Sequence, residues 1–257
     1  MSIENSFDSK SKALISPEDI YGIHDKFADI CIVTFSRSVL DKVLKLYSCK
    51  KVAYTGTANG KIPIYYRETA ELNVLFYMSP IGAAIAGTIM DEVRVLTGAS
   101  KFIVFGSCGI LYKDKCEGKI IVPSAAYRDE GFSYHFIKAD DYISIEKCSE
   151  ISKFFEINDI AFTIGKTWTT DAFYRETINN IDLRIKEGCI CVEMECAGLQ
   201  ALCNFRNIYL YPFFFGGDLL NNSSWERNTL GLNTEKEYQI ASFSVALSLA
   251  KWLYCNI

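Results

Sequence analysis

The sequence predicts an α/β protein: a single domain with a central, twisted, mixed and mostly parallel sheet flanked by helices. Three observations support this class. Short apolar runs rich in β-branched residues, typical of strands buried on both faces, alternate with segments whose apolar residues recur at helical spacing. No repeat, low-complexity insert or linker interrupts this alternation. The length of 257 residues suits one large domain with a substantial core.

The expected elements follow from the position of each pattern. Residues 1–16 are polar and without period, so we expect a flexible N-terminal tail followed by a single domain over 17–257. The dipeptide Asn59-Gly60 is a strong hairpin signal between two strand-like runs. The expected strands cover 29–35, 52–57, 62–66, 71–78, 101–105, 119–122, 160–167, 189–192 and 208–215. The expected helices cover 38–47, 82–96, 145–155, 176–186, 197–203 and 234–254.

Composition excludes several classes of protein. Charged residues make up 23% and hydrophobic ones 49%, and the net charge is −4, so the chain has no basic surface for nucleic acid. No apolar run reaches the roughly 20 residues of a membrane helix, and the first residues carry no basic-then-apolar signal. We therefore expect a cytoplasmic protein whose partners are small molecules, without contact to nucleic acid or membrane.

The ten cysteines are spread along the chain, mostly inside apolar runs. This distribution indicates buried thiols in a reducing compartment rather than a disulfide framework. The only histidines are His24 and His135, and no Cys-x-x-Cys occurs. We therefore expect no metal site.

The stretch from Cys191 to Gly198 carries the clearest functional signal. A buried strand ends here and a helix begins, and this edge of an open α/β sheet is where ligands bind. Glu193 and Glu195 are two residues apart and share one face of extended backbone, with Met194 opposite. A carboxylate can accept from both hydroxyls of a vicinal diol, such as that of ribose. For these residues alone, a strand end with solvated acids is an equally good interpretation.

The run Glu193-Met194-Glu195 followed by small residues resembles the ribose-binding signature of the nucleoside phosphorylase family. This family includes purine-nucleoside and uridine phosphorylases and their nucleosidase relatives. The resemblance implies that Glu195, with Met194 and Glu193, holds the ribose. It also implies a homodimer or homohexamer with sites completed by neighbours, and no metal or organic cofactor.

Two further segments resemble family motifs. Gly106-Ser107-Cys108-Gly109 follows a buried strand, and its backbone N–H groups and the Ser107 hydroxyl can receive an anion. It is neither a P-loop nor a dinucleotide fingerprint, but it is similar to the family's phosphate- and ribose-facing loop. The segment from Arg128 to Phe136 is similar to the family's Arg-Asp-Glu-Gly-x-Ser-x-His motif. Without the resemblance, simple turns explain both.

Aromatic side chains stand beside hydroxyls in the segment 168–176. An aromatic ring is a stacking platform for a flat nucleobase. The resemblance places a base-stacking aromatic at Trp168, and we expect Phe173 and Thr170 to complete the base site. The alternative is that Trp168 and Phe173 belong to the core.

Asp218 stands at the end of an apolar strand. Apolar surroundings raise the pKa of a carboxyl group, so we expect the protonated form of Asp218 to be favoured. A positioned acid that protonates purine N7 contributes about 10²–10⁴ in rate. The purine-acting members of the family carry an aspartate here, whereas the Gln-x-Arg pair of the uridine-acting members is missing at Arg175-Glu176-Thr177. Arg227 is expected to orient Asp218. The alternatives are a turn acid at Asp218 and an exposed arginine at Arg227.

The phosphate site departs from the family's pattern. The family's phosphorylases hold phosphate with arginines, but the position two residues before the Gly-Ser loop is Val104. The turn after the first strand reads Thr34-Phe35-Ser36-Arg37, so Arg37 is offset from its expected place. It remains the expected phosphate ligand beside Ser107 and Gly106, with Arg67 and Arg128 as alternatives. The nucleosidases activate water with a glutamate after the first strand, and no acid occurs there.

The sequence therefore predicts a purine-nucleoside phosphorylase that cleaves the N-glycosidic bond, with inorganic phosphate as co-substrate and no cofactor. A nucleosidase, a uridine phosphorylase and a nucleoside-binding protein without turnover are the alternatives.

Overall fold

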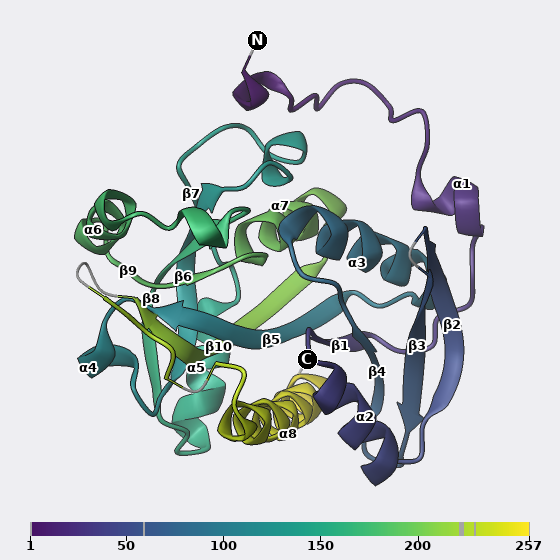
Figure 1. Ribbon diagram of the computed structural model, residues 1–257. Helices are drawn as coiled ribbons and strands as arrows, with labels where there is room; N and C mark the ends of the chain where they lie inside the picture. Colours follow the sequence, from purple (N-terminus) through teal and green to yellow (C-terminus); the bar gives the residue numbers. More distant parts are fainter. Residues whose placement is uncertain (1, 59, 221–223, 229, 257) are drawn as a thin grey trace.

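The computed structural model describes residues 2–58, 60–220, 224–228 and 230–256, and shows a mixed sheet between layers of helices (Figure 1). The strands are β1 (Ile30–Thr34), β2 (Lys50–Thr57), β3 (Gly60–Glu68), β4 (Asn73–Met78), β5 (Lys101–Ile110), β6 (Ile120–Asp129), β7 (Tyr142–Ser144), β8 (Phe162–Thr170), β9 (Cys189–Glu193), β10 (Tyr209–Leu220) and β11 (Trp225–Glu226).

Six of the described α-helices begin and end close to the expected positions, and two short ones, over 17–21 and 113–116, were not predicted. The α-helices are α1 (Pro17–Tyr21), α2 (Arg37–Leu46), α3 (Ala83–Thr97), α4 (Lys113–Cys116), α5 (Cys148–Ile157), α6 (Ile178–Lys186), α7 (Cys196–Arg206) and α8 (Asn233–Asn256). Three 3₁₀ turns complete them: η1 (Ile3–Asn5), η2 (Ser133–His135) and η3 (Phe173–Arg175). The expected hairpin forms between β2 and β3, although Asn59 itself lies outside the described residues.

The sheet closes on itself at one side. Its order is β11-β10-β6-β8-β9-β5-β1-β4-β3-β2, with β7 on β6, and β10 also pairs with β5. Strands β5, β9, β8, β6 and β10 therefore form a closed ring, from which β1, β4, β3 and β2 extend as an open wing. The sheet is mixed, as expected, with parallel pairs such as β1–β4 and β5–β10 beside antiparallel pairs such as β5–β9. The ring was not predicted, because the alternation of elements does not show which strands pair.

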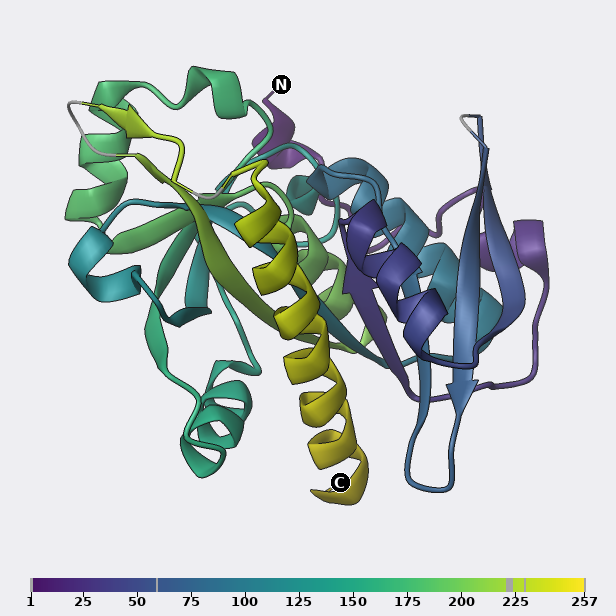
Figure 2. The same ribbon diagram turned by 60° about the horizontal axis from the view of Figure 1, so that its bottom comes forward.

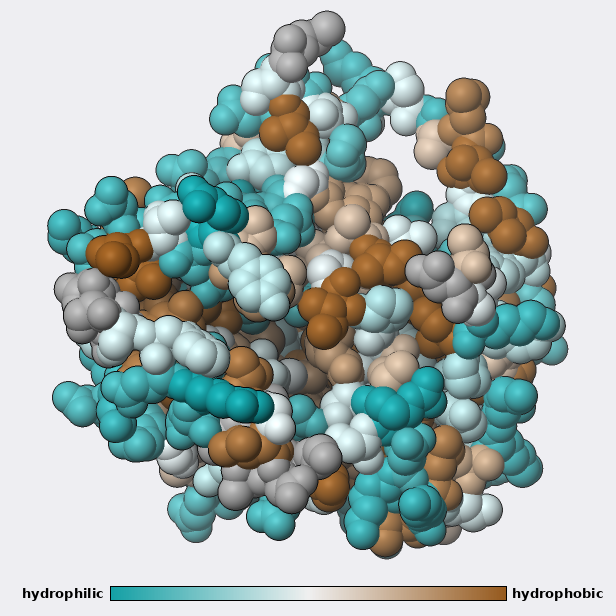
Figure 3. All heavy atoms as spheres, viewed as in Figure 1, coloured by the Kyte–Doolittle hydropathy of each residue, from teal (hydrophilic) through white to brown (hydrophobic). Residues whose placement is uncertain are grey.

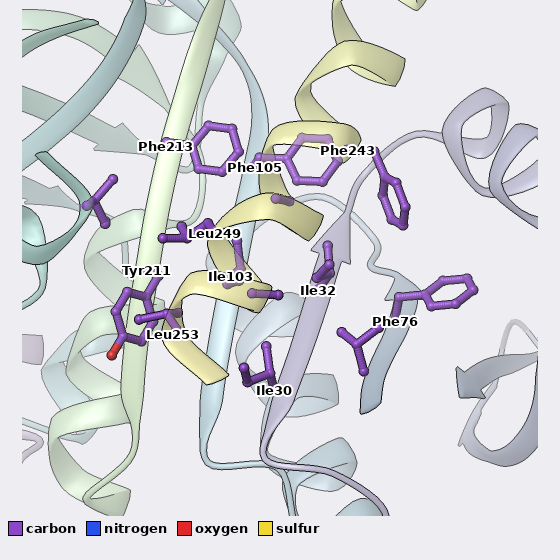
Figure 4. Close-up of a cluster of buried hydrophobic side chains, with 14 of the residues drawn as sticks. Ile30, Ile32, Phe76, Ile103, Phe105, Tyr211, Phe213, Phe243, Leu249 and Leu253 are labelled. Carbon is purple, nitrogen blue, oxygen red and sulfur yellow. The ribbon is translucent and has the colours of Figure 1, made fainter. Parts of the chain in front are cut away.

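Helix α8 covers one face of the sheet, where its apolar side chains meet four strands (Figures 2 and 4). Phe243, Leu249 and Leu253 of the helix are buried in a cluster with side chains of β1, β4, β5 and β10. Within this cluster, Phe105 of β5 and Phe213 of β10 stack with ring centroids 5.7 Å apart. The apolar runs of these strands thus form the main core.

Helices α3 and α7 cover the other face, and glycines let them pack closely. A Cβ added at Gly198 of α7 would lie 2.8 Å from the Ala83 side chain, and one added at Gly87 of α3 would lie 2.3 Å from the Phe132 ring. Both distances are shorter than van der Waals contact allows. Small residues at these positions therefore set the spacing between α3, α7 and the segment that carries η2.

The N-terminal segment arches over the outside of α3 and α7, and Figure 3 shows a hollow beneath it. The segment carries η1, and Ser16 caps α1 in a capping box with Asp19. A cavity of about 760 Å³ lies between this segment, the two helices and Phe132.

Two absences hold for the part of the chain that the structure describes. None of its helices is both long and apolar enough to cross a bilayer. Within the same residues, no three His, Cys, Asp or Glu side chains are arranged to hold a metal ion.

The core that α8 covers gives a first prediction. Phe213→Ala removes a fully buried ring stacked on Phe105, so we expect it to lower the free energy of unfolding by about 3–5 kcal/mol in urea denaturation. The control Phe213→Leu keeps most of the volume and should cost about 1–1.5 kcal/mol. Equal losses in both variants would contradict this account of the packing.

Candidate active site

A cavity of about 300 Å³ lies where β5, β9 and β10 end. It brings together most of the residues singled out in the sequence, although these come from four separate stretches of chain. The predicted site residues that line it are Gly106, Ser107, Phe173, Glu193, Met194, Glu195 and Asp218.

The Glu193 carboxylate joins two strands to a helix at the wall of this cavity. Its Oε2 accepts from the backbone N–H groups of Glu195 and Cys196, both at 2.7 Å, at the start of α7. Its Oε1 accepts from the hydroxyls of Thr169 at 2.5 Å and Thr167 at 3.3 Å, both on β8. Burial raises the pKa of Glu193 to about 6, against the opposing effect of these hydrogen bonds. Glu193 therefore fixes the turn between β9 and α7.

Glu195 is placed by that turn and faces the cavity. Its Oε1 accepts from the backbone N–H of Gly82 at 2.6 Å, which ties it to the residue just before α3. Burial, and next the negative charge of Glu193, raise the pKa of Glu195 to about 8. A carboxyl group held in this way gains from any ligand that donates hydrogen bonds or brings positive charge.

Asp218 reaches the same cavity because β10 is irregular there. The register between β10 and β5 shifts between Gly216 and Asp218, which indicates a bulge at Gly217. Opposite it, a Cβ added at Gly109 would lie 3.4 Å from Asp218 Oδ1 and only 2.3 Å from Leu220. The bulge on one strand and the bare glycine on the other thus make room for the carboxyl group.

Two residues of this site were missed by the sequence analysis. The Trp225 indole N–H donates to Asp218 Oδ2 at 2.7 Å, across the antiparallel pair of β10 and β11. Glu176 also lines the cavity, just after η3. Burial, and next the negative charge of Asp218, raise the pKa of Glu176 to about 8. The sequence did contain a signal for Glu176, an acid at the end of the aromatic segment 168–176. This position was interpreted only as lacking the Gln-x-Arg pair of the uridine-acting members.

Trp168 and Thr170 do not line the cavity. Trp168 is 2% exposed, belongs to a cluster with Leu111, Val192 and Leu220, and donates its indole N–H to Asp129 at 2.9 Å. Its strand β8 is one of the strands of the closed ring, and the Trp168 side chain packs into the core there. Thr170 is buried, and its hydroxyl accepts from the Ala172 N–H. Of the expected base-binding residues, the structure brings Phe173 to the cavity, with 48% of it exposed.

The candidate arginines also lie elsewhere. Arg37 is exposed, with Nη1 4.0 Å from an oxygen of Asp41. Arg67 lies over the Tyr47 ring. Arg128 is buried, where its Nε donates to Ser133 Oγ and its Nη1 to backbone carbonyls.

Arg227 donates through Nε to the backbone carbonyl of Leu230, which itself lines the cavity. Among the described lining residues, no lysine or arginine occurs, whereas four carboxyl groups do. A turn was expected from the sequence at Gly106-Ser107. In the structure this segment is part of β5, because it pairs with β10.

Comparison with known proteins agrees with this arrangement. Residues 29–213 match the sequence profile of the Phosphorylase superfamily, and the chain belongs to this family. It is 30% identical over 128 residues to a DeoD-type purine nucleoside phosphorylase of Shewanella oneidensis, a match that covers 48% of this chain and 53% of the relative. It is 24% identical over 186 residues to a guanosine phosphorylase of Halorubrum lacusprofundi, covering 72% and 69%. The chain thus spans about half the length of the first of these relatives.

Solved structures share the fold. A futalosine hydrolase mutant and a protein titled MTAN, both of Helicobacter pylori, superpose with a TM-score of 0.67 at 15% identity. Each comparison covers 86% of this chain and 97% of the other. The sequence profile confirms the resemblance to the nucleoside phosphorylase family, and the solved structures confirm the mixed α/β fold.

The role of Glu193 gives a second prediction. Glu193→Ala leaves two buried N–H groups and the Thr169 hydroxyl without their acceptor, so we expect a loss of about 2–4 kcal/mol in the free energy of unfolding. Glu156→Ala, an exposed glutamate of α5, serves as control and should change stability by less than about 0.5 kcal/mol. A Glu193 variant as stable as this control would show that the carboxylate does not hold the turn.

The pKa of Glu195 gives a third prediction. Because the folded state raises this pKa from 4.5 to about 8, folding favours the protonated acid, and its contribution to stability falls as pH rises from 4.5 towards 8. Glu195→Gln removes the titration while its amide oxygen can still accept from Gly82. Urea denaturation at pH 5 and pH 7 should therefore show the variant gaining on the wild type by about 1 kcal/mol per pH unit. A difference independent of pH would contradict the raised pKa.

Proposed function

We propose that this protein is a purine-nucleoside phosphorylase, which cleaves the N-glycosidic bond with inorganic phosphate to give the free base and ribose 1-phosphate. The observation that carries the proposal is that Glu195 and Asp218, from separate elements, line one cavity. A nucleoside has one end that suits each group: a diol that donates hydrogen bonds, and a base that leaves more readily when it is protonated.

Glu195 is proposed to bind the ribose, with Met194 against the sugar. The 2′ and 3′ hydroxyls donate to the carboxylate and so favour its ionised form. As the glycosidic bond breaks, positive charge develops on the sugar, and the attraction to a buried carboxylate becomes stronger. The interaction is therefore worth more in the transition state than in the bound substrate, which is what accelerates the reaction.

Asp218 is proposed to protonate N7 of the departing purine while the base lies against Phe173. Asp218 Oδ2 accepts the Trp225 N–H, and we propose that the proton for N7 comes from Oδ1, the oxygen on the side of Gly109. Trp225 thereby orients the acid, the role that the sequence analysis gave to Arg227.

Phosphate is proposed to bind at Ser107 and Gly106, and no cofactor is required. The support for phosphate is the similarity to curated phosphorylases. The described lining holds four carboxyl groups and no lysine or arginine, so it offers phosphate no opposite charge. Phosphorolysis therefore needs a cation from outside this set, and we propose that a neighbouring subunit of a homodimer or homohexamer supplies it.

Hydrolysis is the second candidate, and the absence of lysine and arginine among the described lining residues favours it. Water is neutral, so it needs no positively charged partner in the cavity, whereas phosphate does. The same groups at the sugar and the base serve either reaction, because both pass through bond cleavage with departure of the base.

The test is base release from inosine, adenosine and uridine, with and without inorganic phosphate. Release of a purine base that requires phosphate and yields ribose 1-phosphate supports the proposal. Release that is independent of phosphate would replace it with hydrolysis. Faster turnover of uridine than of the purine nucleosides would indicate a uridine phosphorylase. Tight nucleoside binding without release of a base would indicate a binding protein.

Substitution of the acid gives a fourth prediction. Asp218→Asn keeps an oxygen that accepts from Trp225 but has no proton to give, so we expect kcat for inosine to fall by about 10²–10⁴. Glu156→Gln serves as the control and should leave kcat unchanged. A kcat for Asp218→Asn within a factor of three of the wild type would remove the general acid from the proposal.

A further inference from the structure

The acidic lining residues are Glu176, Glu193, Glu195 and Asp218, and Glu176 has neither a part in the proposed function nor, like Glu193, a turn to hold. It follows η3 directly, so it comes from the same short turn as Phe173. It is partly buried at the wall of the cavity, although it lies outside the ribose-binding segment. A base lying against Phe173 therefore has an edge near Glu176.

Several charged groups lie near Glu176 and bear on which edge of the base it meets. Asp218 on β10 and Glu176 line the same cavity, so a base bound there can meet both carboxyl groups. Glu193 and Glu195 line the cavity from the β9–α7 turn. Arg175, the preceding residue, is exposed, and Arg227 is directed to the carbonyl of Leu230.

One edge of a purine can meet both Asp218 and Glu176. N7 and the 6-substituent are neighbours on one edge of a purine: adenine presents an acceptor and an amino donor there, and guanine presents two acceptors. If Asp218 meets N7, a second carboxyl group of the same cavity can lie beside the 6-substituent. That substituent is what distinguishes 6-oxopurines from 6-aminopurines.

We propose that Glu176 recognises the 6-substituent of the purine and makes the preference for 6-oxopurines depend on pH. A protonated Glu176 donates a hydrogen bond to O6. An ionised Glu176 has no proton to donate, so two hydrogen-bond acceptors then face each other and repel. An amino group at the 6-position donates to either form. This inference rests on the proposed function, since it assigns the base within the same site.

The direction of the pH dependence follows from the surroundings of Glu176. Burial, and next the charge of Asp218 when that acid is ionised, raise the pKa of Glu176 to about 8, so Glu176 is protonated in neutral solution and ionises as pH rises beyond that value. Burial is the larger cause and also acts while Asp218 carries the proton for N7, so the direction is the same in both states of Asp218. The ratio of kcat/KM for inosine to that for adenosine should therefore be highest below pH 8. It should fall about tenfold between pH 7 and pH 9.

The fifth prediction compares the wild type with Glu176→Gln and with the control Glu156→Gln over this range. Glutamine donates and accepts like the protonated acid but does not titrate, so the ratio in Glu176→Gln should stay constant while the control follows the wild type. Ionisation of the substrate itself affects all three proteins equally. A ratio that falls in Glu176→Gln as it does in the wild type would overturn the assignment.

Equilibrium binding separates this inference from the proposed function. Isothermal titration calorimetry with free hypoxanthine and adenine requires no turnover, so it reports base recognition even if no nucleoside is cleaved. Hypoxanthine affinity that falls with pH in the wild type and not in Glu176→Gln supports the inference whatever the activity. Absence of binding by both bases at every pH, or affinities that change alike in both proteins, would overturn it.

Discussion

The buried carboxylate of Glu193 is the constraint on which the rest of the site depends. It accepts two backbone N–H groups from the start of α7 and two threonine hydroxyls from β8, so a single side chain joins three elements. A buried charge is tolerated only when it is well hydrogen-bonded, and these donors supply that condition. Because Glu195 is two residues further on, its direction into the cavity is fixed by the same contacts.

The closed ring of strands determines where the cavity can lie. Parallel pairing of β5 with β10 brings Gly106 and Ser107 beside Phe214 and Phe215, and the bulge at Gly217 then turns Asp218 towards the space in front of them. Asp218 and the Gly106-Ser107 segment therefore lie on paired strands of one sheet, with Glu195 just after the end of β9, and α8 supports these strands through the aromatic cluster around Phe105 and Phe213.

The sequence predicted the elements and the position of the acids well, because strand and helix periodicity and the strand-end location of Glu195 and Asp218 are local properties. It left open whether Trp168 binds the base or lies in the core, since the burial of a side chain on a strand of the closed ring depends on pairing far along the chain. Trp225 and Glu176 were missed for the same reason: each matters through its position beside Asp218. The offset of Arg37 was visible in the sequence, and the structure directs that side chain to Asp41.

The most direct test of this account is a crystal structure of the protein with a bound purine nucleoside, obtained with an analogue that resists cleavage. The account predicts the ribose diol within hydrogen-bond distance of Glu195, the base against Phe173, and N7 facing Asp218. A nucleoside bound elsewhere, for example beneath the N-terminal segment, or seated in this cavity with its sugar away from Glu195, would contradict it.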